Sequence, residues 1–459
     1  MLKELFASRY FFLLSLAAII ILALFLRIHN IFSYNSYWAD DGGAHIAYLE
    51  TIRHDGRLPT LEENYLAWHE PLYYLLTALW VAVGAVFGIT SLNWSEALQI
   101  LFFFIAAFAV EGIAYRHSKG NKIVTVFSVM AFSFFFTAVK LSAYLTNELL
   151  AQALILSAVL PFLYGRLGEK SPPEYAGKSR KNLIAFSIIL GIATLVKLTA
   201  FVALGAAVLT WLIAFARTRE QSFLFSAAVA LAIVGIINLP WVVYKYHHFD
   251  SVFTINLAES GTKQSIVSSD GWQYLRTLNA HVFSDYPYWF RGPHSFVSIL
   301  IADAFGDYYN LFGQADRVRA LPDTEKILTG NGRYTTPANW RANAWAIRTG
   351  LVISLVSVIG FIGFIVSRFR SRSWTANDIF LTLLVLGGFL SLVYNVLRLP
   401  YLERGTLKAQ FILFAFPLLW IISNTWWSRV VKRPAILSLI IGAPWIVYLF
   451  LAWPILWVS

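Results

Sequence analysis

The chain is organised around one stretch, Trp38-Ala39-Asp40-Asp41-Gly42-Gly43-Ala44-His45, which places two adjacent carboxylates in a glycine-containing turn. An apolar run of residues 10–28, long enough to cross a bilayer, comes shortly before it. Moving a carboxylate pair toward hydrocarbon is costly unless the pair is solvated or paired. We therefore expect a polar site at one membrane surface, carried by helices that cross the membrane.

The composition is that of a polytopic membrane protein. Of the 459 residues, 58% are hydrophobic and only 13% are charged. The apolar segments run to about 16–24 residues, the length that spans a hydrocarbon core of about 30 Å. Helices are the expected spanning elements, because the strands of a membrane barrel would show short alternating segments. We expect an all-α fold in which residues 1–459 form one transmembrane domain.

The net charge of +11 does not by itself indicate a nucleic-acid partner. Lys and Arg gather in the cytoplasmic loops of membrane proteins, and this accounts for the excess. We expect membrane lipids and no nucleic acid among the partners. The chain has no cysteine, which excludes disulfides, thiolate nucleophiles and cysteine-ligated metals.

The distribution of Lys and Arg predicts about eleven spans, with the N-terminus in the cytoplasm. Residues 29–94 are the expected first external loop, in which residues 44–54 form an amphipathic surface helix and the apolar run 71–88 lies on the surface or re-enters. Residues 244–346 are expected to form one long external loop. The predicted spans lie at 10–28, 95–115, 122–139, 149–165, two within 182–215, 223–243, 347–367, 379–397, 409–426 and 435–457.

Some basic residues depart from the gathering of Lys and Arg on the cytoplasmic side, because they fall in short external segments. They are Arg27, Arg53, Arg57, Lys140, Lys197, Arg398, Arg404 and Lys408. Lys197 interrupts a long apolar run and is expected at an outer turn, where it suits a lipid phosphate or simply snorkels to the interface. Arg404 and Lys408 suit a phosphate as well, since a guanidinium can hold two phosphate oxygens.

Three segments of the first loop carry a resemblance to a known family: Asp41-Gly42-Gly43-Ala44-His45-Ile46-Ala47-Tyr48, His54-Asp55-Gly56-Arg57-Leu58-Pro59 and His69-Glu70-Pro71-Leu72-Tyr73-Tyr74-Leu75-Leu76. They resemble the first external loop of the polyprenyl-phosphate-sugar-dependent glycosyltransferases of the GT-C fold, near protein O-mannosyltransferases and lipid A aminoarabinose transferases. That loop typically reads Asp-Glu, two residues, His, and later His-Pro-Pro-Leu-Tyr-Tyr.

This registration places Asp41 at the family's catalytic aspartate. The chain departs from the pattern at Gly42, where a second acid is usual, and at Glu70, where proline is usual. Asp40 is the alternative carboxylate. A plain structural role is also open, because either aspartate can cap the helix that follows.

Three further patches fit the same resemblance. Tyr144-Leu145-Thr146-Asn147-Glu148 looks like the family's second acidic motif, and the stretches 191–200 and 398–411 look like its Thr-Lys turn and its late basic motif. The resemblance implies a catalytic or orienting role for Glu148, although a helix start also favours a carboxylate. It implies that Lys197, Arg404 and Lys408 bind the donor phosphate. Possible substrate-binding residues are His45, His69, Glu70 and Asn147.

The resemblance implies a membrane glycosyltransferase with its active site outside the cell, in the plasma membrane if the source is prokaryotic. Asp41 or Asp40 would take a proton from an acceptor hydroxyl on a glycan, lipid or protein, and a hexose or pentose would leave a polyprenyl phosphate with inversion. The family's use of lipid monophosphate donors implies no metal and no cofactor. A lipid transporter or flippase is the competing class, in which the aspartates carry protons. Residues 301–310 would line an acceptor groove or form an interfacial belt.

Overall fold

The computed structural model describes residues 8–39, 41–89, 91–165, 167, 176–249, 269–283, 295–310, 321–328, 334–398 and 408–457. Helices dominate this part of the chain, and its strands form a single two-residue antiparallel pair. The α-helices are α2 (Arg9–Ser33), α3 (Gly42–Asp55), α4 (Leu72–Val86), α5 (Leu92–His117), α6 (Lys122–Phe134), α7 (Phe136–Leu141), α8 (Glu148–Gly165), α9 (Ala176–Thr194), α10 (Phe201–Thr218), α11 (Gln221–Phe249), α12 (Ser269–Arg276), α13 (Phe296–Phe305), α15 (Pro337–Ser371), α16 (Ala376–Arg398), α17 (Ala415–Val430), α18 (Pro434–Ile441) and α19 (Ala443–Leu456). The 3-10 helices are η1 (Ser36–Trp38), η3 (Leu198–Ala200), η5 (Ala280–Phe283) and η8 (Ala409–Ile412), and the strands are β1 (Ile327–Leu328) and β2 (Tyr334–Thr335).

The chain is an integral membrane protein. Within the described ranges, eight helical segments are long and apolar enough to cross a membrane. Each coincides with a predicted span, and α18 with α19 counts as one of them. The other three predicted spans correspond to α6, α9 and α17, of which α6 and α17 are only 13 and 16 residues long. The eight segments support the all-α fold class, and the total of eleven stays a prediction.

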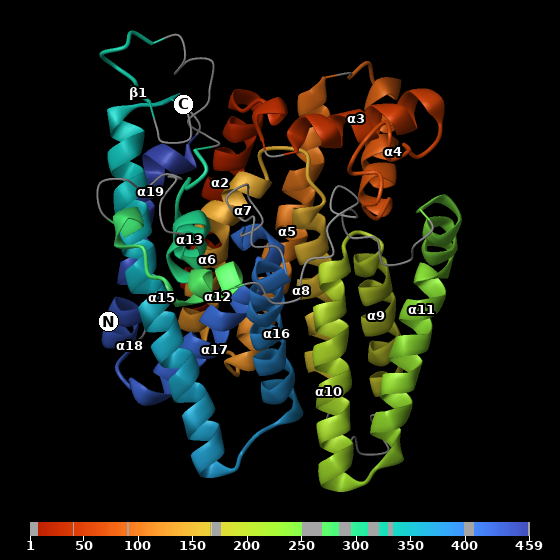
Figure 1. Cartoon of the computed structure of the whole chain (residues 1–459). Coiled ribbons are helices and arrows are strands. Elements are labelled where there is room, and N and C mark those ends of the chain that lie inside the picture. The colour runs from red at the N-terminus through yellow and green to blue at the C-terminus, as the bar shows by residue number, and fades with distance from the viewer. Residues whose placement is uncertain are drawn as a thin grey trace.

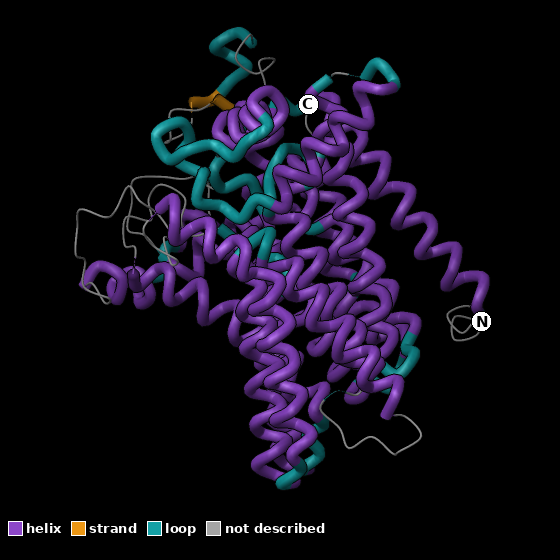
Figure 2. The backbone as a smooth tube through the Cα atoms, turned by 90° about the vertical axis from the view of Figure 1, so that its right-hand side faces the viewer, coloured by secondary structure: helices purple, strands orange, loops and turns teal. Residues whose placement is uncertain are grey.

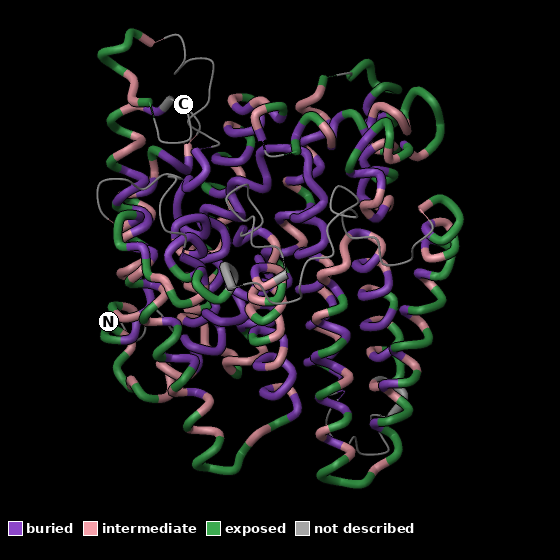
Figure 3. The backbone as a smooth tube through the Cα atoms, viewed as in Figure 1, coloured by how far each residue is buried: buried purple, intermediate pink, exposed green. Residues whose placement is uncertain are grey.

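The core lies among the central helices. Helix α8 packs against α5 and α9, while α15 packs against α17 and α19. Figure 1 shows α9, α10 and α11 side by side at one flank, and Figure 2 shows the first part of α2 leaning away from the other helices. Buried residues concentrate in the centre, and the outward faces of α10, α11 and α15 remain exposed (Figure 3). Those faces carry large apolar side chains such as Leu209, Ile236 and Leu355, as expected where a helix meets lipid.

Helices α3 and α4 cover one end of the bundle (Figure 1). Helix α3 buries one face through His45, Ile46, Tyr48 and Leu49, which agrees with the predicted amphipathic helix. Helix α4 has 15 residues, so it extends only about 22 Å at 1.5 Å per residue. That length falls short of the hydrocarbon core.

Of the two expected roles of residues 301–310, an acceptor groove or an interfacial belt, the structure contradicts the belt. Helix α13 and the residues after it are buried, with Asp303 and Tyr308 at 1% and 2% exposure. An interfacial belt needs exposed aromatic rings, so this part of the prediction is wrong. Helix α13 instead packs against α7, α15 and η8.

Candidate active site

Asp41 occupies a strained turn directly before α3. Its φ is +58°, in the left-handed region, and its side chain makes no capping hydrogen bond to the helix. The alternative that Asp41 caps α3 is therefore wrong. The carboxylate is exposed, and Tyr65 Oη donates a hydrogen bond of 2.5 Å to Asp41 Oδ1.

The backbone around this turn is tightly held. The Ser36 hydroxyl donates to Glu96 in the first turns of α5 and accepts a hydrogen bond of 3.2 Å from the Leu145 amide. A Cβ atom at position 42 would lie 1.8 Å from the Ser36 carbonyl oxygen. The second acid that the family usually carries here cannot fit this backbone, so Gly42 is required by the close approach.

Glu148 and Lys197 form an ion pair across two loops. Glu148 is the first residue of α8, and its side chain is 3% exposed against 17% for Lys197. Glu148 Oε1 accepts from Lys197 Nζ, whereas Oε2 has no hydrogen-bond partner among the described residues. The ammonium also lies 4.9 Å from the centroid of the Phe411 ring. Lys197 is thus held by a buried carboxylate rather than extended alone to the interface.

Two hydrogen bonds place the turn that carries Lys197. The Leu72 amide, at the start of α4, donates to the Leu195 carbonyl at 3.3 Å. Asn147 Nδ2 donates to the Val196 carbonyl at 3.2 Å. The structure therefore uses Asn147, one of the possible substrate-binding residues, to fix the Lys197 turn beside the start of α8.

Lys408 belongs to the same electrostatic environment. It is 5% exposed and its ammonium lies 5.9 Å from the Tyr309 ring centroid. The charges of Asp41, Lys197 and Lys408 all act on the His45 ring, and the same three charges act on the Glu148 carboxylate. We call Asp41, Glu148, Lys197 and Lys408 the charged cluster. The fold thus brings together four predicted residues from four separate segments.

His45 and His69 flank one buried tyrosine. Tyr74 Oη lies 2.7 Å from His45 Nδ1 and 3.3 Å from His69 Nδ1. Burial lowers the pKa of His45 to about 4, although Asp41 opposes this shift. Burial also lowers the pKa of His69 well below its usual value, and Lys197 adds to the effect. Both rings are therefore neutral at pH 7 and hold Tyr74 through hydrogen bonds.

Glu70 is buried rather than open to a ligand. Its carboxylate pairs with Lys245 of α11 at 3.0 Å, and each side chain is 3% exposed. Burial raises the pKa of Glu70, while Lys245 opposes the shift. This pair ties α11 to the chain just before α4.

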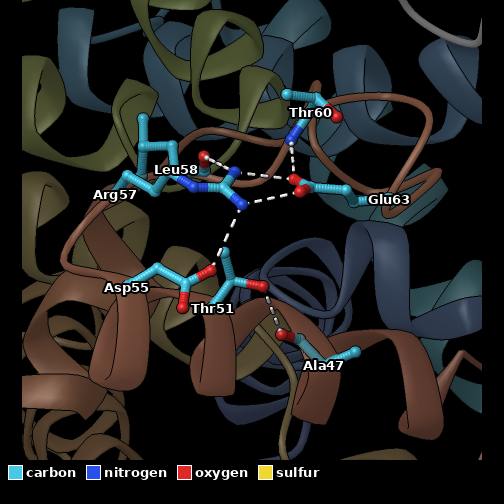
Figure 4. A network of polar contacts seen from close by, with 7 residues as sticks. All are labelled: Ala47, Thr51, Asp55, Arg57, Leu58, Thr60 and Glu63. Carbon is cyan, nitrogen blue, oxygen red and sulfur yellow. Dashed lines mark hydrogen bonds and ion pairs between the residues drawn. The ribbon is translucent and has the colours of Figure 1, made fainter.

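The rim of the first loop carries an exposed ion-pair network (Figure 4). Arg57 donates two hydrogen bonds to Glu63, of 2.7 and 2.6 Å, and one of 3.2 Å to Asp55. Hydrogen bonds from Arg57 and the Thr60 amide lower the pKa of Glu63 to about 2. Arg57, which the sequence marked as an unusual external cation, is thus neutralised by its own loop.

Asp40 and Arg404, two of the predicted site residues, lie outside the described residues. Tyr65 and Phe411 were not predicted as site residues. Tyr65 follows Asp41 by 24 positions, and no spacing in the sequence relates the two. Within the described ranges, no group of three His, Asp or Glu side chains is placed to hold a metal ion.

No family model matches this chain, and no curated protein matches it in sequence. In structure, the chain is similar to the oligosaccharyltransferase of Archaeoglobus fulgidus in its apo form, with a TM-score of 0.56 and 13% identity over 97% of this chain. The form of that enzyme tethered to an acceptor peptide with the NVT sequon matches with a TM-score of 0.52, 13% identity and 98% coverage of this chain. The chain spans 56% and 55% of the length of these two structures.

An ArnT from Cupriavidus metallidurans bound to undecaprenyl phosphate matches 93% of this chain and 79% of its own, with 14% identity and a TM-score of 0.42. A score this low adds no support. The oligosaccharyltransferase matches show the fold: this chain has the GT-C fold, as the resemblance of its loops predicted.

Proposed function

We propose that this chain transfers a sugar from a polyprenyl-phosphate-linked donor to an acceptor hydroxyl at the outer membrane face. The observation that carries the proposal is the charged cluster. A carboxylate beside a turn and two lysines from distant segments act on the same buried groups. They do so in a fold shared with an oligosaccharyltransferase.

Asp41 is the proposed general base. Its carboxylate is exposed, makes no capping bond and is held in place by Tyr65. It takes the proton of the acceptor hydroxyl as that oxygen bonds to the anomeric carbon from the face opposite the phosphate. The product is then inverted at that carbon, and no covalent enzyme intermediate forms.

Lys197 and Lys408 are the proposed phosphate ligands, with Arg404 as a third. As the bond between the anomeric carbon and the phosphate oxygen breaks, its electron pair stays on the polyprenyl phosphate, which becomes more negative. Cations placed before the reaction stabilise that charge most in the transition state. Glu148 pairs with Lys197 and orients its ammonium, so we assign Glu148 a positioning role.

The reaction as proposed needs neither metal nor cofactor, because the lysines meet the charge of the leaving group. In the same proposal, the acceptor is a hydroxyl of a glycan, lipid or protein, and the transferred sugar is a hexose or pentose. The active site lies on the non-cytoplasmic side of the membrane. Asp40 is the alternative base.

The test is transfer from radiolabelled polyprenyl-phosphate mannose, or a polyprenyl-phosphate pentose, by the purified full chain. Total membrane lipids and glycans serve as the acceptor pool. Asp41→Asn is expected to lower the rate by about 10²–10⁴-fold, the range of general-base contributions. Asp55→Asn is the matched control, since Asp55 is an exposed carboxylate of the same loop that pairs with Arg57.

Asp40→Asn distinguishes the two candidate bases. Full transfer activity in both the Asp41 and the Asp40 variant would overturn the base assignment. A flippase would instead move labelled donor across vesicle bilayers without forming a glycosylated product, and that result would overturn the proposed function.

A further inference from the structure

A second group of charged residues lies at the far end of the bundle from the charged cluster. Helix α5 connects the two ends: Glu96, near its start, contacts Ser36, and His117 is its last residue. The 21 residues between Glu96 and His117 cover about 32 Å at 1.5 Å per residue. This exceeds the thickness of a hydrocarbon core, so the two groups lie at opposite membrane surfaces.

Four polar side chains surround one buried ring, that of Phe364 in α15. The His117 and Trp374 rings lie 5.8 and 6.3 Å from it, between centroids. The guanidinium carbons of Arg368 and Arg429 lie 5.2 and 5.9 Å from its centroid. We call His117, Phe364, Arg368, Trp374, Asp378 and Arg429 the Phe364 cluster. Its members come from α5, α15, α16, α17 and the connection between α15 and α16.

Several donors of the Phe364 cluster have no acceptor. His117 Nε2, Arg368 Nε and Trp374 Nε1 are buried atoms that find no hydrogen-bond partner within the described ranges. Arg429 forms no hydrogen bond or ion pair with any described residue. Buried polar atoms are normally satisfied, so the unpaired N–H groups of Arg368 and Trp374, with His117 Nε2 beside them, indicate a missing acceptor. His117 Nε2 donates to such an acceptor in its Nε2–H tautomer.

The cluster also carries more positive than negative charge. Asp378 is its single carboxylate, and Asp378 Oδ2 already accepts from Arg368 at 3.0 Å and from the Thr375 amide at 3.2 Å. Arg368 further donates to the Ser373 carbonyl at 3.2 Å. The second guanidinium, that of Arg429, is left without a counter-charge, although the charges of Arg368 and Asp378 both act on it.

We infer that the Phe364 cluster binds the phosphate of an anionic membrane lipid, in the leaflet opposite the proposed active site. A phosphate supplies several acceptor oxygens and a negative charge, and guanidinium groups bind it through two parallel hydrogen bonds. Arg429 and Arg368 are the charged ligands, and His117 and Trp374 supply further donors. A membrane lipid is the expected source of this phosphate, because the Phe364 cluster lies where α5 and α15 end, at the membrane surface.

The test is native mass spectrometry of the delipidated full chain with added phosphatidylglycerol, alongside phosphatidylcholine and inorganic phosphate. Arg429→Gln is expected to lower the retention of phosphatidylglycerol by about tenfold, the effect of losing one charged ligand. Arg370→Gln is the matched control. Arg370 is an exposed arginine near the end of α15 and does not belong to the Phe364 cluster. It should change retention by less than about twofold.

Equal losses in the two variants would mean diffuse attraction to a basic face and would overturn the inference. Equal retention of phosphatidylcholine and phosphatidylglycerol by the wild type would also overturn it. Binding of inorganic phosphate without retention of phosphatidylglycerol would overturn the inference that the ligand is a lipid. The cluster would then be a site for free phosphate. If Arg429→Gln does not fold, Arg429→Lys keeps the charge without the fork and should show an intermediate loss. Sugar transfer does not enter this readout, so the inference is independent of the proposed function.

Discussion

Two lysine–carboxylate pairs of this protein differ in how completely they are closed. Lys140 of α7 and Asp303 of α13 lie 2.9 Å apart, and each side chain is 1% exposed. Both carboxylate oxygens of Asp303 are used, since Oδ2 accepts from the Ala409 amide at 2.7 Å. In the pair of Lys197 with Glu148, the ammonium is partly exposed, and Glu148 Oε2 accepts no hydrogen bond from the part of the chain that the structure describes.

The difference separates a structural pair from one that can take a ligand. The Lys140–Asp303 pair joins α7, α13 and the start of η8, and in doing so it holds the chain beside Lys408. The Lys197 ammonium keeps contact with solvent, since its side chain is 17% exposed, so an anion from outside can reach it. One pair therefore builds the site, and the other belongs to it.

The largest expected effect comes from removing the charge of Asp303 in the buried Lys140–Asp303 pair. Asp303→Asn leaves the Lys140 ammonium buried without its counter-charge, which should lower the free energy of unfolding by about 3–5 kcal/mol. Glu148→Gln should cost less than half of that, because Lys197 can reach water. Thermal unfolding of both variants in one detergent compares them. Equal losses would contradict the distinction between the two pairs.

The next effect concerns transfer rather than stability. Lys197→Gln should lower the rate of sugar transfer by about 10²-fold, as expected when one donor to a developing negative charge is lost. Lys197→Arg keeps the charge and should retain more activity than Lys197→Gln. Lys326→Gln, a change in a pair whose aspartate is exposed, is the matched control and should leave transfer unchanged. Transfer at the wild-type rate by the Lys197→Gln variant would show that Lys197 does not bind the donor phosphate.

The smallest expected effect is a pH dependence of stability that comes from His45, whose ring lies in the field of Lys197. Burial lowers the pKa of His45 from 6.5 to about 4, so the unfolded chain binds a proton at higher pH than the folded chain does. Stability should rise with pH between about 4 and 6.5, and lowering the pH from 6.5 to 5 should cost about 2 kcal/mol at this one residue.

His45→Gln should remove that part of the pH dependence, measured by thermal unfolding at pH 5 and 6.5. His54→Gln, which changes an exposed ring of the same helix, is the control. An unchanged pH dependence in His45→Gln would show that the ring is not held neutral by its burial.

Much of the site was predictable because its residues sit in local motifs. Each motif places a polar residue at the end of a helix in an otherwise apolar part of the sequence. The motifs are the turn at Asp41, the helix start at Asn147-Glu148 and the turn at Lys197. The partners of these residues were not predictable. Lys140 and Asp303 are 163 positions apart, and Glu70 and Lys245 are 175 apart, so no periodicity relates them.

The departures from the family pattern also needed the fold to be understood. Gly42 reads as a missing acid in the sequence, whereas the structure shows that its Cβ would collide with Ser36. Glu70 reads as a missing proline, and it is the buried partner of Lys245.

Hydropathy and charge by themselves determined that this chain is a helical membrane protein with its polar motifs in defined loops, because spanning length and the exclusion of charge from lipid act along the chain. Which of those polar residues contact one another depends on how the helices pack. Ion pairs and buried hydrogen bonds depend on distance in space, so helix packing selected Glu148 for Lys197, Asp303 for Lys140 and a shared electrostatic field for Asp41 and Lys408.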